Sequence, residues 1–90
     1  MPRELLVTAS EGLEAAADDT TEPAASERLA DLAEQLSTLS TADRGPDHGR
    51  LARIQSALND LKTGDAADAS DDIEAANDAI NEYRSDLAGV

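Results

Sequence analysis

Hydrophobic residues recur along the chain at intervals of three and four positions, and polar residues fill the positions between them. This spacing is typical of amphipathic helices, because residues three and four apart lie on the same helical face. Four stretches show it, over residues 3–19, 22–40, 47–63 and 65–87, and no stretch shows the alternation of a strand. The pattern therefore predicts an all-α fold.

The second and fourth stretches carry the longest hydrophobic seams. In the second, spacings of four and three alternate as in a coiled coil, through Ala25, Leu29, Leu32, Leu36 and Leu39. In the fourth, the same alternation runs through Ala66, Ala69, Ile73, Ala76, Ile80, Tyr83 and Leu87. Shorter stripes mark the first and third stretches, at Leu6, Ala9, Leu13 and Ala16 and at Leu51, Ile54, Leu58 and Leu61.

Helix-breaking residues separate these stretches. Residues 41–46 include Gly45 and Pro46, which disfavour helix continuation and predict a linker. Thr20 or Thr21 is the expected N-cap of the second helix.

The return between the third and fourth helices is predicted to be tight. Gly64 suits the position just after a helix, and Asp65 would cap the next helix at once. In the alternative, residues 65–72 form a loop, Asp71 caps the fourth helix and Glu74 completes a capping box. Either way, we expect an antiparallel bundle of three to four helices built from two helical hairpins, forming a single domain over residues 1–90. Gly12 either lets another helix approach closely or weakens the first helix.

The hydrophobic content suggests a second chain. Leu, Ile, Val and Phe supply only 16 of 90 residues, whereas Ala supplies 18. A core lined by alanine gives little burial against a backbone entropy cost of about 1–2 kcal/mol per residue. The seams of the second and fourth helices are long enough to accept another copy, so we expect a homodimer. The alternative is a monomeric bundle.

The charge composition indicates adaptation to a solvent of high salt concentration. Twenty acidic residues against seven basic ones give a net charge of −13, and six of the seven cations are Arg. Asp is short and strongly hydrated, whereas Lys carries a long apolar stem, so this composition favours solubility in concentrated salt. The sequence therefore predicts a halophilic protein, and we expect it to be cytoplasmic.

Glu74, Asp78, Glu82 and Asp86 form an acidic row four residues apart, opposite the hydrophobic seam of the same helix. Like charges at this spacing cost about 0.2–0.5 kcal/mol per pair. Because the Debye length is only about 3 Å at 1 M salt, the row is expected to be tolerable in brine. Carboxylates along one face cannot wrap around a calcium ion, so the row predicts a solvated surface and no metal site.

Several functions are not expected from this sequence. Cys, Trp and Phe are missing, which excludes disulfides, Cys-ligated zinc and base stacking on Trp or Phe. The longest run of bulky apolar residues, Leu5-Leu6-Val7, is too short for a membrane span or a signal-peptide core.

The candidates for chemistry lie near the linker. His48 is the single histidine, and beside Asp47 it reads as an exposed residue at a helix start. Arg44, Arg50 and Arg53 concentrate positive charge there, and we expect Arg50 and Arg53 to pair with carboxylates of a neighbouring helix or of a dimer mate. We do not expect nucleic-acid binding, because the attraction of this small basic patch for phosphates would have to overcome the repulsion from a net charge of −13.

Tyr83 is expected to anchor the core or an interface. We expect no enzyme, and therefore no catalytic, cofactor-binding or metal-binding residues.

The second half of the chain also carries a family resemblance. The pattern is Asp47-His48-Gly49-x-Leu51-x-Arg53-Ile54, then Leu58-x-x-Leu61, Ile73-Glu74-Ala75-Ala76 and Ile80-x-Glu82-Tyr83-Arg84. It resembles a small haloarchaeal family of acidic, all-helical proteins of unknown function, most strongly over residues 47–90. The resemblance implies a short helical domain and assigns no activity.

Two functions remain in view. The first is a non-enzymatic, self-associating helical interaction module adapted to high salt. The second is a small acidic regulatory protein that binds a basic protein partner or a DNA-binding regulator.

Overall fold

The computed structural model describes residues 3–41 and 48–88, which form four α-helices. The helices are α1 (Arg3–Asp19), α2 (Pro23–Thr41), α3 (His48–Lys62) and α4 (Ser70–Ala88), and a short 3₁₀ helix η1 (Ala67–Ala69) precedes α4. No strand occurs in these two described ranges, so the predicted all-α fold is confirmed.

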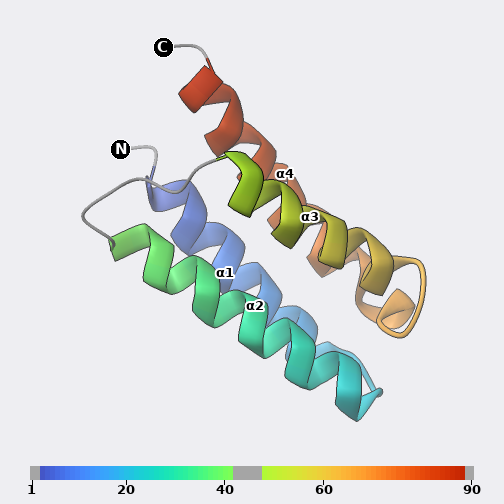
Figure 1. The fold of residues 1–90 in the computed structure, drawn as a ribbon. Helices are drawn as coiled ribbons and strands as arrows, with labels where there is room; N and C mark the ends of the chain where they lie inside the picture. Colours follow the sequence, from blue (N-terminus) through green and yellow to red (C-terminus); the bar gives the residue numbers. More distant parts are fainter. Residues whose placement is uncertain (1–2, 42–47, 89–90) are drawn as a thin grey trace.

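The helices form two antiparallel hairpins, α1–α2 and α3–α4, in a bundle measuring 39 × 20 × 18 Å (Figure 1). Helix α1 packs extensively against both α2 and α4, and α3 packs on α4. Helices α2 and α3 make the least contact of any neighbouring pair. The bundle is therefore tight around α1 and more open between α2 and α3.

Both long seams are covered within the chain as far as their side chains are described, which for the fourth helix means through Tyr83, because the side chain of Leu87 lies outside the description. The fully buried large side chains come from all four helices and are Leu6, Leu13, Leu29, Leu32, Leu36, Leu51, Leu58, Ile73 and Ile80. Tyr83 is 3% exposed, so it anchors the core as expected. Among the described residues, Val7 is the one large hydrophobic residue that is exposed. The homodimer stays a prediction, but the seams do not provide its surface.

Small residues allow α1 and α4 to approach closely. A Cβ atom placed on Gly12 would lie 3.3 Å from the Cβ of Ala76, which is tighter than ordinary contact. The glycine therefore permits the close helix approach that was one of its two expected roles.

A polar network joins α3 to α4. The Nε2 of Gln55 donates to the side-chain oxygens of Asn77 and Asn81, each at 2.7 Å. The Gln55 Oε1 accepts from Arg84 at 2.6 Å, and Asn77 donates to Asn59 at 3.3 Å. Gln55 is buried, and these bonds satisfy its amide.

The expected N-cap of α2 is wrong. The helix begins at Pro23, so neither Thr20 nor Thr21 occupies the capping position. The Thr20 hydroxyl donates instead to the Asp68 carboxylate at 2.8 Å, and the Thr21 backbone N–H donates to it at 2.9 Å. These contacts cross from one hairpin to the other, which local sequence cannot reveal.

The expected start of the fourth helix, at Asp65, is also wrong. Gly64 follows the end of α3 as predicted, and a Cβ there would lie 3.0 Å from the Asp60 carbonyl oxygen. The chain then makes a turn and η1, and α4 begins at Ser70. Asp71 consequently lies inside the first turn and does not cap it.

The other bounds differ little from the sequence pattern. Helix α2 continues through Thr41, where a linker was expected, and α3 ends at Lys62. The rest of the predicted linker, residues 42–46, lies outside the described residues. In the acidic row, Glu74, Asp78 and Glu82 are exposed, while the side chain of Asp86 also lies outside the description.

Candidate functional site

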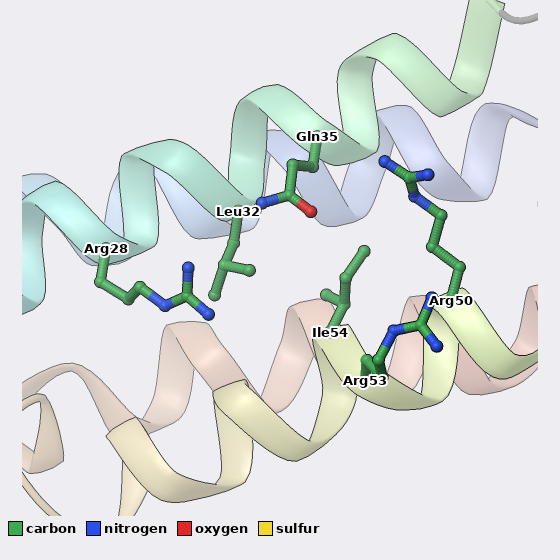
Figure 2. Close-up of a pocket in the computed structure, with 6 residues that line it drawn as sticks. All are labelled: Arg28, Leu32, Gln35, Arg50, Arg53 and Ile54. Carbon is green, nitrogen blue, oxygen red and sulfur yellow. The ribbon is translucent and has the colours of Figure 1, made fainter.

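A groove lies where α2 and α3 separate. It encloses about 380 Å³ and is lined by Arg28, Leu32, Gln35, Arg50, Arg53 and Ile54. Figure 2 shows Leu32 and Gln35 on α2 facing Ile54 on α3, with Arg28 toward one end and Arg50 and Arg53 toward the other. We refer to this surface as the α2–α3 groove.

Helical periodicity explains which residues line it. On α2, Arg28 and Gln35 stand four residues before and three residues after the seam residue Leu32. On α3, Arg50 stands four residues before Ile54. Residues at these spacings share a face, so each seam brings its polar neighbours to the rim of the groove. Leu32 and Ile54 are 2% and 3% exposed and form a closed floor.

The two rims differ in charge. Three of the seven basic residues line the groove, although the whole chain carries −13. On α2, Arg28 is paired with Asp31 at 3.4 Å, and Asp31 also accepts from Gln35 at 3.1 Å.

A second hollow of about 280 Å³ adjoins the groove. It is lined by Asp31, Glu34, Gln35, Thr38 and Arg50. The α2 rim therefore carries two carboxylates and the guanidinium group of Arg28, and the α3 rim carries two guanidinium groups.

Sequence reasoning found part of this site. It selected Arg50 and Arg53, which the fold brings to the groove. It missed Arg28, whose place there depends on the packing of α2 beside α3. Arg44 and Asp47 lie outside the described residues, as does the side chain of His48.

Buried polar side chains serve the fold. The Ser10 hydroxyl of α1 donates to the Ala33 carbonyl of α2 at 2.7 Å, and Gln55 holds α3 against α4. Among the side chains that the structure describes, every buried nitrogen or oxygen has a hydrogen-bond partner.

The described residues contain neither a candidate metal site nor a membrane-spanning helix. Among those described, His, Asp and Glu side chains form no group of three that could hold a metal ion. None of the described helices combines the length and apolarity needed to cross a membrane.

Two carboxyl groups near the loops have opposite pKa shifts. The pKa of Asp68 is lowered, first by the backbone N–H of Thr21 and then by the Thr20 hydroxyl. The pKa of Asp72 is raised, first by a hydrogen bond with Asp19 and then by burial and by repulsion from Asp19 and Asp71.

These shifts predict opposite effects of pH on stability. A carboxyl with a lowered pKa stabilises the fold above its unfolded value, and this contribution is lost as pH falls through the folded pKa. One with a raised pKa stabilises the fold below its unfolded value, and this contribution is lost as pH rises through the folded pKa. At neutral pH we therefore expect Asp68→Asn to lower the urea midpoint and Asp72→Asn to raise it.

Urea unfolding at constant high salt checks this pair. The deficit of Asp68→Asn should shrink as pH falls below the ordinary value of 3.8. The gain of Asp72→Asn should likewise shrink toward low pH. Equal midpoints for both variants and the wild type at neutral pH would contradict the expectation.

Comparison with known proteins gives one match. The sequence model of a family described as "Family of unknown function (DUF7553)" matches residues 1–86. This match includes the first half of the chain, whereas the family resemblance in the sequence was strongest over residues 47–90. No match to the chain was found among curated proteins or among solved structures.

Proposed function

Because the chain belongs to this family of unknown function, its role must be argued from its structure, and we propose a non-enzymatic, self-associating helical interaction module adapted to high salt. We place it in the cytoplasm of a salt-accumulating, haloarchaeal cell. The observation that carries the proposal is the α2–α3 groove, a hollow of mixed charge on the outside of a bundle whose hydrophobic seams are already covered.

The composition of the groove supports a non-enzymatic role. Catalytic groups commonly stand in clefts with perturbed pKa values and partners placed for proton transfer. Here the floor of the groove is aliphatic, and Asp68 and Asp72, whose pKa values are shifted, do not line it. Both carboxyl groups interact with residues at the end of α1 or just after it.

The surface supports adaptation to salt. Every carboxylate side chain that the structure describes is exposed, except the half-buried Asp72. Hydrated carboxylates keep the surface in contact with water and ions, and salt screens their mutual repulsion.

Self-association has to use a surface outside the seams, because those are buried within the chain. Analytical ultracentrifugation in KCl tests it. Above about 1 M salt, where repulsion between net charges is screened, we expect a species of twice the 9.4 kDa chain mass. In dilute buffer, two copies of charge −13 repel each other, and the dimer should dissociate. A single 9.4 kDa species at every salt concentration would contradict self-association.

The acidic row on α4 favours a second candidate, a small regulatory protein that covers a basic site on a larger protein. Glu74, Asp78 and Glu82 are exposed on one helical face, as such a contact would require. Affinity capture at high salt separates the two candidates. Recovery of the chain alone supports self-association, and a stoichiometric basic protein supports the regulatory role.

A further inference from the structure

We propose that the α2–α3 groove is the surface through which two copies of this chain bind each other. A two-fold axis along the groove would place α2 of one copy against α3 of the other. This inference rests on the proposed self-association, and it adds the surface, the symmetry and the residue pairs.

The rims of the groove complement each other in charge. Asp31 and Glu34 stand on the α2 rim together with Arg28, which pairs with Asp31, whereas Arg50 and Arg53 stand on the α3 rim. A two-fold axis parallel to the helices exchanges the rims, so the acidic rim of each copy meets the basic rim of the other. The same contact then occurs twice, and the assembly closes as a dimer.

The positions along the groove also fit. Helices α2 and α3 run antiparallel (Figure 1), and Glu34 lines the same hollow as Arg50. These two residues therefore lie at the same level, and rotation about the axis keeps that level. Glu34 of each copy would then lie beside Arg50 and Arg53 of the other.

Within one chain, Glu34 and Arg53 are not used for such contacts. Both side chains are exposed, and neither forms an ion pair or a side-chain hydrogen bond with another residue in the described part of the chain. Sequence reasoning assigned Arg53 to a carboxylate of a neighbouring helix or of a dimer mate. Since Arg53 pairs with no carboxylate in the described part of its own chain, a carboxylate of a dimer mate is the candidate that remains.

The mixed charge of the face favours a second copy over a small free anion. Two carboxylates on the α2 rim lower the positive potential that such an anion would require, and Arg28 already forms an ion pair with Asp31. A second copy carries both carboxylates and guanidinium groups in complementary positions, so its arginines would form ion pairs with these carboxylates.

High salt is compatible with this dimer. Repulsion between two copies of charge −13 acts over long distances and is screened first. Guanidinium–carboxylate pairs act at hydrogen-bond distance and can be bidentate, so salt weakens them less.

Charge reversal tests the proposal by sedimentation in about 1 M KCl. Arg53→Glu and Glu34→Arg should each raise the dimer dissociation constant about tenfold or more, because each places like charges together twice. An equimolar mixture of the two variants should form a heterodimer with both contacts restored. The double variant R53E/E34R should also dimerise, within about threefold of the wild type.

Glu14→Arg on α1 is the matched control for Glu34→Arg, since it makes the same charge change at an exposed position that does not line the groove. Circular dichroism of each variant checks that helix content is unchanged. Should the wild type dimerise and both single variants dimerise equally well, the groove is the wrong surface while self-association stands. A monomeric wild type would overturn self-association and this inference together.

Discussion

Replacing Leu13 with alanine is expected to lower the free energy of unfolding by about 2–5 kcal/mol, as large-to-small substitutions in cores do. Leu13 is fully buried on α1, the helix that packs against both α2 and α4. Its neighbours cannot close the cavity easily, because the backbones of α1 and α4 already approach closely at Gly12 and Ala76. A domain of this size has a typical stability of only about 5–13 kcal/mol, so the loss is a large fraction.

Val7→Ala on the same helix provides the control. Val7 is 44% exposed, so removing its methyl groups leaves no cavity. The higher helix propensity of alanine should keep the change within about 0.5 kcal/mol of zero. Urea unfolding in high salt measures both variants, and a similar small effect for Leu13→Ala would contradict the tight packing around α1.

Dialysis into dilute buffer is expected to remove most of the helical circular dichroism. The Debye length grows from about 3 Å at 1 M salt to about 30 Å at 0.01 M, so carboxylates across the whole bundle then repel each other. The exposed row Glu74, Asp78 and Glu82 adds like-charge pairs along α4, at about 0.2–0.5 kcal/mol each. Salt that is excluded from the surface also strengthens apolar burial, so its removal weakens the core.

The variant D78N/E82Q separates charge repulsion from the general effect of salt on burial. It removes two charges from the α4 row and should shift the salt midpoint of refolding to a lower concentration. The control E4Q/D60N removes two charges from exposed positions on α1 and α3, and it should shift the midpoint less because neither residue has another acidic residue three or four positions away in its helix. Undiminished helix content of the wild type in dilute buffer would contradict the proposed salt adaptation.

The sequence predicted the helices well because their hydrophobic periods are regular. The seam of α2, for example, is buried along its whole length, from Ala25 to Leu39. Periodicity does not tell which helix covers a seam. From the sequence, the α2 and α4 seams could therefore accept a second chain or be covered in a monomeric bundle, and in the structure α1 packs against both helices.

Features set by tertiary contacts could not be predicted. Thr20 and Thr21 have the right residue types for a helix cap, but Asp68 receives their hydrogen bonds from 47 and 48 residues away. The groove is a second example. The helical faces of its arginines could be predicted from their spacing, but its shape could not, because it depends on the limited contact between α2 and α3. Arg28 was missed for that reason.

The Gln55 network determines how α3 and α4 align. A stripe of aliphatic side chains can slide by one helical turn and still be covered, since any apolar neighbour will serve. Gln55, Asn77 and Asn81 cannot slide in this way, because a shift would separate donors from acceptors and leave the buried Gln55 amide without partners, at about 1–3 kcal/mol. In a protein with so few bulky residues, the hydrogen bonds of these amides thus select a single register of α3 on α4, while burial of the apolar side chains stabilises the bundle.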